Sequence, residues 1–386
     1  MLDPETIPCA LYIHLPWCIR KCPYCDFNSY EGTAPSEPHY VDALLEDLDA
    51  ELAEAPARPL HSIFFGGGTP SLFSADAIGM ILNGVRARVA LEPGCEITLE
   101  ANPGASDAER FQGYRAAGVN RLSIGVQSFD DRNLRAIGRI HDAQCALQAA
   151  ESARAAGFDN LNLDLMYGLP EQDQGSLAQD LARALAIFPE HLSLYQLTIE
   201  EGTPFSHRPP VRPGESEIEA MESLLAPVVS AAGYRRYEVS AYARLDRTCR
   251  HNLNYWNFGD YIGIGAGAHG KISRADGIWR YRKPRQPQAY LRAHSQAITP
   301  TRLLPDEILF EFMLNATRLV DGFPLSLFEH RTGQSGARLV HALRPALARG
   351  LAAIDGNHVR PTLLGSRFLN DLQALFLPAA SCADVR

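Results

Sequence analysis

The sequence has little that would suit it to a membrane, to a secretory route or to nucleic acid. Its 386 residues carry 36 lysines and arginines against 45 aspartates and glutamates, a formal charge of -9 that disfavours non-specific binding to phosphate backbones. No run approaches the roughly 18 consecutive apolar residues of a membrane span. The segment from Met1 to Ala10 holds Asp3 and Glu5 but no basic side chain. We therefore predict neither a membrane span nor a secretion signal, and we leave peripheral membrane contact open.

Cysteine is also scarce, and much of it lies in one place. Eight cysteines in a chain of this length do not make a disulfide framework, which predicts a reducing, cytoplasmic location. Five are scattered singly and read as core or surface residues: Cys9, Cys95, Cys145, Cys249 and Cys382. The other three follow the mostly apolar run from Leu11 to Pro16 and are close together: Cys18, Cys22 and Cys25.

The spacing of these three cysteines favours an iron-sulfur cluster. Thiolates bind soft metals and clusters, and a short loop with three and then two intervening residues can wrap three ligands around one centre. Three ligands on a cubane leave one iron open for a substrate or cofactor. Two alternatives remain: Cys22 and Cys25 form a redox pair, or His14 joins the three cysteines in a zinc site.

Short apolar segments alternate with amphipathic segments through most of the chain. The expected strands are 11–16, 62–66, 96–101, 121–127, 160–166 and 191–198. The expected helices are 38–54, 74–90, 106–117, 142–156, 175–187 and 216–232. Ser74 and Ser106 are expected N-caps, and Gly118 and Gly157 are expected helix stops. Repeated strand and helix pairs predict an α/β fold with a parallel sheet, a partial (β/α)6 barrel.

Polar and glycine residues stand near the carboxyl ends of these strands, where such barrels build their sites. Besides the cysteines they are Gly66-Gly67-Gly68-Thr69-Pro70, Glu100, Asn102, Gln127 and Asp164. Each has a plain explanation alone: a tight glycine turn, a surface carboxylate, or a polar core residue with satisfied hydrogen bonds. Together on one rim they favour a ligand site. Arg139 follows some of these residues in the sequence. Its guanidinium is suited to binding a carboxylate, or it is only a charge at the end of a helix.

Two motifs beyond the barrel are less specific. Gly265, Gly267 and Gly270 satisfy G-x-G-x-x-G, but no helix is expected to open there, so close backbone packing is favoured over a dinucleotide site. His251 lies in Arg250-His251-Asn252-Leu253-Asn254-Tyr255-Trp256 and is either a structural residue or a metal ligand.

The C-terminal part predicts a small α+β, winged-helix-like domain. Its expected elements are helices at Asp306–Leu319, Leu339–Leu347 with a kink at Pro345, and Leu364–Phe376, and a hairpin at Ala352–Leu363. Its balanced charge favours a structural or docking role over DNA binding. Residues 283–288 read as a linker or loop. We assign 1–235 to the barrel core, 236–300 to a barrel extension and connecting segment, and 301–386 to the C-terminal domain.

Together these motifs resemble the radical S-adenosylmethionine (radical SAM) family, in the branch of oxygen-independent coproporphyrinogen III oxidase. The resemblance rests on the three cysteines and on Gly66 to Pro70, Glu100 to Pro103, Gly125 to Phe129 and Asp164 to Pro170. It implies a [4Fe-4S] cluster on Cys18, Cys22 and Cys25, with S-adenosylmethionine on the fourth iron. It further implies the residues that line the S-adenosylmethionine site: Tyr12, Tyr24, Gly67, Gly68, Thr69, Glu100, Gln127, Arg139 and Asp164.

Two functions are found within that branch. The oxidase pattern has a longer N-terminal segment and a further cysteine two positions after the third ligand, where this sequence has Phe27. Both departures speak against coproporphyrinogen decarboxylation, so enzyme activity is left open and no catalytic residue is assigned. Cys25 to Ser29 and His251 to Trp256 instead resemble the haem-chaperone branch. The resemblance implies haem binding, with His251 as the haem-linked residue.

The expected partners follow from the same resemblance. They are haem, haem-accepting respiratory proteins and an electron donor such as flavodoxin or ferredoxin, with no nucleic acid. Coproporphyrinogen III oxidase activity is the alternative function. A radical SAM reaction on a substrate such as RNA is the third, which the acidic balance disfavours. A homodimer is left open.

Overall fold

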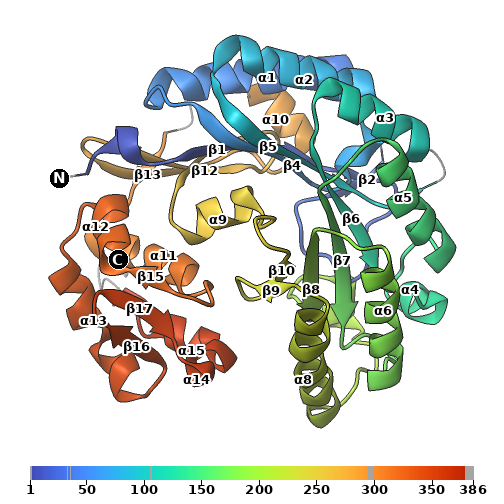
Figure 1. Cartoon of the computed structure of the whole chain (residues 1–386). Helices are drawn as coiled ribbons and strands as arrows, with labels where there is room; N and C mark the ends of the chain where they lie inside the picture. Colours follow the sequence, from blue (N-terminus) through green and yellow to red (C-terminus); the bar gives the residue numbers. More distant parts are fainter. Residues whose placement is uncertain (1, 33, 35, 105–106, 294–298, 379–386) are drawn as a thin grey trace.

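The computed structural model describes residues 2–32, 34, 36–104, 107–293 and 299–378. A curved sheet carries helices on its outer side, and a smaller, mainly helical unit lies beside one end of it (Figure 1). The six predicted strands are confirmed as β1 (Cys9–Leu15), β4 (Leu60–Gly67), β5 (Leu91–Ala101), β6 (Arg121–Gln127), β7 (Leu161–Tyr167) and β8 (His191–Gln196). They are parallel neighbours in chain order, as the alternation of segments predicts.

The predicted outer helices are confirmed as well, and shorter ones lie between them. They are α1 (Glu37–Glu54), α2 (Ala75–Arg88), α3 (Asp107–Ala117), α4 (Asp131–Ala136), α5 (Ala143–Ala155), α6 (Gln174–Ala186), α7 (Pro204–His207) and α8 (Glu215–Ala231). Ser74 caps α2, since its Oγ accepts a hydrogen bond from the Ala77 amide at 3.2 Å. Gly118 and Gly157 end their helices with φ of +111° and +86°. Ser106 lies outside the described residues.

The strands separate apolar from polar side chains by alternation. In β6, Leu122, Ile124 and Val126 are buried in the main hydrophobic core. Arg121 and Ser123, which alternate with them, line a cavity on the other side of the sheet. Because successive side chains of a strand point to opposite faces, one strand both anchors the outer helices and supplies the interior polar groups.

The sheet extends further than the sequence predicted. The additional strands are β9 (Arg235–Arg236), β10 (Ala241–Ala243), β11 (Asp260–Ile264), β12 (His269–Arg274), β13 (Gly277–Arg282) and β14 (Thr301–Arg302). The full order is β14-β13-β12-β11-β1-β4-β5-β6-β7-β8-β10-β9, so β14 and β9 are its edges. The strand β11 pairs in parallel with β1 on the side away from β4. Short helices flank this extension: α9 (Arg250–Trp256) and α10 (Pro287–Ala293).

The glycine motif after β11 packs against the first strand. Gly265 has φ of +99°, and a Cβ on it would lie 2.4 Å from the His14 carbonyl oxygen. The motif joins antiparallel strands β11 and β12 and opens no helix. The prediction of close backbone packing is therefore confirmed.

Residues 283–286 of the predicted linker or loop form a loop, α10 begins at Pro287, and the loop is fastened to the rest of the chain by Lys283. Its ammonium is buried and pairs with Asp47 Oδ1 and Glu51 Oε1, each at 2.5 Å. Buried charges are retained where they are paired, so this segment is fastened to α1. The single lysine gave no sign of this partnership, because both carboxylates lie far back in the sequence.

The C-terminal unit has its own hydrophobic core, which also takes in Phe258 and Ile278. Its elements are α11 (Pro305–Ala316), β15 (Phe323–Pro324), α12 (Leu325–Thr332), α13 (Gly336–Ala348), β16 (Ala352–Asp355), β17 (His358–Pro361), α14 (Leu363–Arg367) and α15 (Leu369–Ala374). The single helix predicted for Leu364–Phe376 is wrong, because the chain breaks at Phe368 (φ -108°, ψ 49°). The helix α12 and the strand β15, which pairs with the hairpin, were not predicted.

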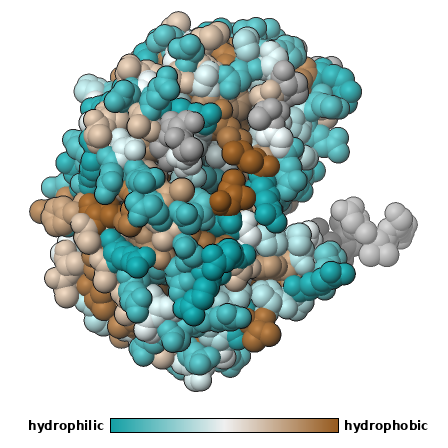
Figure 2. Space-filling view, turned by 90° about the vertical axis from the view of Figure 1, so that its right-hand side faces the viewer, coloured by the Kyte–Doolittle hydropathy of each residue, from teal (hydrophilic) through white to brown (hydrophobic). Residues whose placement is uncertain are grey.

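The surface is largely hydrophilic on the side that carries α5 and α6. There, hydrophobic residues gather at a notch between an upper and a lower part (Figure 2). Within the described ranges, we find no helix with the length and hydrophobicity needed to cross a bilayer.

Candidate functional site

The three cysteines lie on a loop that is closed at its base by a short parallel pairing. Cys18 ends β2 (Trp17–Cys18), and Glu31 opposite it belongs to β3 (Tyr30–Glu31). The Gly32 amide donates a hydrogen bond to the Cys18 carbonyl at 2.9 Å. Cys22 and Cys25 are half-buried between these ends. Backbone bonding thus fixes the loop without help from a metal.

The loop covers a cavity of about 130 Å³, the cofactor cavity. The three cysteines line it together with eight of the predicted site residues: Tyr24, Gly67, Gly68, Thr69, Glu100, Gln127, Arg139 and Asp164. Tyr12 and His251 do not line it. Residues from five strands and their following loops therefore meet at one rim, as the barrel topology predicts.

Hydrogen bonds connect two of the cysteine sulfurs to the rim. The Thr69 hydroxyl lies 3.6 Å from Cys18 Sγ, and Arg139 Nη1 lies 3.7 Å from Cys22 Sγ. Asn102 joins these two residues, since its Nδ2 donates to Thr69 Oγ1 at 2.8 Å and its Oδ1 accepts from Arg139 Nη2 at 2.6 Å. Asn102 was expected on this rim from its place at a strand end, but its two hydrogen-bond partners were not predicted, because they lie far from it in the sequence.

The glycines of the second strand are required by close packing. Gly67 has φ of +123°, and a Cβ there would lie 2.8 Å from the His14 ring. A Cβ on Gly68 would lie 2.5 Å from the Trp17 carbonyl oxygen. The tight approach to the cysteine loop explains both residues, and their exposed backbone still faces the cofactor cavity.

Two buried carboxylates, Glu100 and Asp164, line the cofactor cavity. Burial, and then the nearby Asp164 carboxylate, raise the pKa of Glu100 to about 8. The Gly67 amide donates a hydrogen bond to Glu100 Oε2 at 3.3 Å, which acts in the opposite direction and lowers this pKa. Burial also raises the pKa of Asp164, although Asn162 and Ser123 donate to its oxygens at 2.7 and 3.2 Å. Their neighbour Gln127 has φ of +69° after a register shift in β6, which re-aims its side chain.

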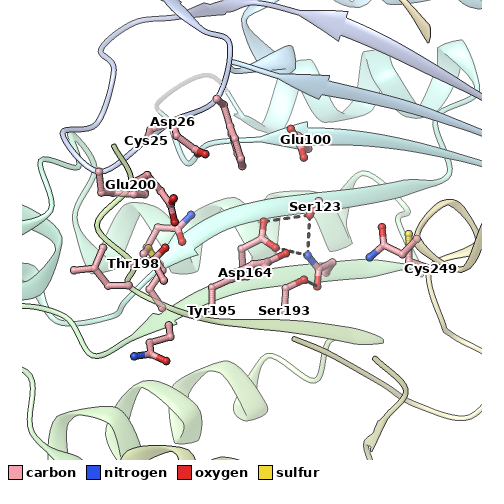
Figure 3. Close-up of a pocket in the computed structure, with 18 of the residues that line it drawn as sticks. Cys25, Asp26, Glu100, Ser123, Asp164, Ser193, Tyr195, Thr198, Glu200 and Cys249 are labelled. Carbon is pink, nitrogen blue, oxygen red and sulfur yellow. Dashed lines mark hydrogen bonds between the residues drawn. The ribbon is translucent and has the colours of Figure 1, made fainter. Parts of the chain in front are cut away.

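A larger cavity of about 360 Å³, the inner cavity, continues from the cofactor cavity. Ser123, Asp164, Ser193 and Tyr195 point into it from neighbouring strands (Figure 3). Arg121, which is 2% exposed, also lines it. Arg121, Ser123 and Ser193 were not predicted as site residues from the sequence. The signal was present as polar residues at every second position of otherwise apolar strands.

The zinc alternative is not supported by the histidine it needs. His14 Nδ1 lies 2.9 Å from the Tyr12 hydroxyl, and its Nε2 lies 2.8 Å from the Asn28 carbonyl oxygen. In the part of the chain that is described, no three His, Cys, Asp or Glu side chains converge on a point that could hold one metal ion. A cubane takes each thiolate on a different iron, so three separated sulfurs around one cavity suit a cluster.

His251 lies behind the wall of the inner cavity. It is buried, its Nδ1 lies 3.3 Å from Ser62 Oγ and its Nε2 lies 3.2 Å from the Tyr255 hydroxyl. Its ring stacks on Phe64 with centroids 4.8 Å apart. Burial, then His61 and Arg121, lower the pKa of His251 to about 3, so the ring is neutral. Its assignment as the haem-linked residue stays a prediction, and it would require both nitrogens to give up these partners.

The comparison with known proteins starts from two family models. Residues 12–184 match the radical SAM superfamily, and residues 303–368 match the HemN C-terminal domain. Over 376 residues the chain is 46% identical to the heme chaperone HemW of Escherichia coli, covering 96% of this chain and 98% of that protein. The chain belongs to the HemW family of radical SAM proteins.

Other relatives agree with this assignment. HemW of Haemophilus influenzae is 43% identical, with 97% of this chain and 99% of that protein covered. The solved structure of coproporphyrinogen III oxidase (HemN) from Escherichia coli matches with a TM-score of 0.79 over 97% of this chain and 91% of that one. At 22% identity that likeness shows the fold alone. The predicted resemblance and the predicted fold class, a partial barrel with a C-terminal α+β domain, are confirmed.

Proposed function

We propose that this HemW-family protein binds haem and passes it to haem-requiring proteins, respiratory ones among them, and carries a [4Fe-4S] cluster and S-adenosylmethionine. The observation that carries the proposal is the 46% identity, over 96% of the chain, to a protein named heme chaperone HemW.

The residues present suit the two cofactors. Cys18, Cys22 and Cys25 would hold the cluster, since their sulfurs surround one cavity and two of them already accept hydrogen bonds from the rim. Glu100 and Asp164 would bind ribose hydroxyls, and Tyr24, Gln127 and the backbone of Gly67 and Gly68 would bind the rest of S-adenosylmethionine. A cluster held by Cys18, Cys22 and Cys25 would supply one-electron reduction to the sulfonium of S-adenosylmethionine bound beside it, with the electron coming from a small external donor.

Phe27 supports haem handling over porphyrinogen decarboxylation. It stands at the position where the oxidase pattern has a further cysteine, and the residue is 62% exposed. It lines both the cofactor cavity and the inner cavity. An exposed aromatic ring at this junction provides a flat apolar contact for a macrocycle and no thiol.

Anaerobic reconstitution with iron and sulfide, followed by titration with haemin, tests the proposal. We expect stoichiometric haem uptake seen by absorbance, and transfer of that haem to an apo-cytochrome in a mixture separated by size exclusion. Absence of haem uptake would refute the proposal. The same reconstituted protein should leave coproporphyrinogen III unchanged when supplied with S-adenosylmethionine and a reductant; turnover to protoporphyrinogen would establish the alternative, an oxidase.

A further inference from the structure

A third cavity of about 450 Å³, the side cavity, opens next to the cofactor cavity. It shares Phe27, Gly67 and Glu100 with the cofactor cavity. Four aromatic rings line it: Tyr12, Phe27, Tyr255 and Tyr261. Its walls come from β1, the cysteine loop, α9 and the β11–β12 junction, which are far apart in the sequence. None of the predictions from the sequence assigned a ligand to this combination.

The side cavity has two histidines that differ in their availability. The ring nitrogens of His14 are both within hydrogen-bonding distance of the protein. His269, the first residue of β12, is exposed and lines the cavity. No hydrogen bond or ion pair of the His269 ring is found among the residues that the structure describes. Burial of part of the ring, and then Arg280, Arg282 and Arg285, lower the pKa of His269, which favours the neutral, metal-binding form.

Two of these arginines are suited to anionic groups of a ligand. Arg282 pairs directly with His269 across the antiparallel strands β12 and β13, so both side chains leave the same face of the sheet. Arg285 follows, and its Nε lies 3.4 Å from Asn28 Oδ1 at the edge of the cavity. Both are exposed. Arg280 is different, because Glu311 already pairs with it at 3.0 Å.

We propose that the side cavity is the haem site, with His269 as an axial ligand of the iron, Arg282 and Arg285 as partners of the carboxylates, and the aromatic walls as the contact for the macrocycle. This inference rests on the proposed function and identifies its site. An iron porphyrin combines the three features that the cavity offers: a metal for a free imidazole, a flat apolar ring, and carboxylates for guanidinium groups.

The site also gives the motif around His251 a different role. Tyr255 forms part of the wall of the side cavity, and its hydroxyl is the partner of His251 Nε2 at 3.2 Å. His251 is then a positioning residue that holds this wall, and it does not touch the iron.

Haemin titration of the full-length, cluster-reconstituted protein tests the site. We expect the unmodified protein to give the absorbance and electron paramagnetic resonance spectra of histidine-ligated haem. His269→Ala should lose this signature, and added imidazole should restore it. His269→Met should shift the bands, and His251→Gln should keep the histidine signature. His330→Ala, at an exposed histidine of α12, is the matched control and should behave as the unmodified protein.

The carboxylate partners are tested with a modified ligand. The double variant Arg282→Gln with Arg285→Gln should bind haemin about tenfold more weakly but leave the affinity for haemin dimethyl ester unchanged. Unchanged affinity for haemin in this variant would overturn the arginine assignment. An unmodified haem spectrum in both His269 variants, with iron content and circular dichroism intact, would overturn the ligand. If the unmodified protein takes up no haemin, the proposed function itself fails.

Discussion

Glu100 should make the stability of the chain depend on pH in a way that one substitution removes. In the folded chain its pKa is about 8, against an ordinary value of 4.5. The folded state therefore holds a proton that the unfolded chain releases between these two values. The contribution of this proton to stability is fully present below pH 4.5, declines as the pH rises toward 8, and is lost above it. Glu100→Gln should abolish this decline, because an amide does not ionise.

The size of the effect follows from the same interval. At about 1.36 kcal/mol per pH unit, the span from 4.5 to about 8 gives an upper limit of about 5 kcal/mol. Since the carboxyl faces a cavity that water can enter, we expect roughly half of this, about 2–3 kcal/mol. At pH 8.5 the free energy of unfolding of Glu100→Gln should thus be higher than that of the unmodified chain by this amount. At pH 5 the two free energies should be nearly equal.

Urea unfolding of the metal-free protein, measured by circular dichroism from pH 5 to 8.5, checks this expectation. Glu109→Gln makes the same chemical change at an exposed position of α3 and should retain the slope of the unmodified chain. Asp164→Asn removes the neighbouring charge that raises the pKa of Glu100, so it should move the decline to lower pH. Parallel pH profiles for Glu100→Gln and the unmodified chain would refute the reasoning.

Three further expectations concern the cysteines, the rim and the extended sheet. Serine at Cys18, Cys22 or Cys25 should reduce the iron bound after anaerobic reconstitution from about four atoms per chain to nearly none, whereas Cys145→Ser should keep it; equal iron content would remove the cluster assignment. Asn102→Ala removes the hydrogen bonds that hold Thr69 and Arg139, so S-adenosylmethionine should bind about tenfold more weakly. Calorimetry on the reconstituted protein measures this affinity, and Asn83→Ala, at an exposed position, is the control. Asp260→Asn leaves Arg58 and Lys271, at 2.7 and 2.8 Å, without their buried counter-charge and should lower the free energy of unfolding by about 3–5 kcal/mol. Asp49→Asn, at an exposed pair, should change it by no more than about 1 kcal/mol, and similar losses in both would argue against the buried pairing.

The sequence was sufficient for features that depend on local pattern. Alternating strands and helices predicted the six parallel strands and their outer helices, and strand ends predicted that Glu100, Gln127 and Asp164 meet at one rim. These predictions hold because parallel strands place their carboxyl ends at the same edge.

Features that depend on partners far away in the sequence could not be predicted. The strand β11 has only five residues, one of them Gly263, and its pairing with β1 makes it a strand. Lys283 lies in a loop as predicted, but its buried ion pairs with Asp47 and Glu51 could not be predicted from the sequence. His251 and His269 lie in equally suggestive motifs, and only burial and hydrogen bonding distinguish an occupied imidazole from an available one.

The long-range attachment of the cysteine loop has a consequence for the order of events during synthesis. Asn28, three residues after Cys25, donates hydrogen bonds to the carbonyl oxygens of Ala266 and Arg285, which follow it by 238 and 257 residues. A nascent chain that has not yet emerged that far from the ribosome has no anchor for this end of the loop. We therefore expect the proposed cluster to be inserted late, and a ribosome-stalled chain that ends before β11 should expose three thiols that alkylating reagents reach.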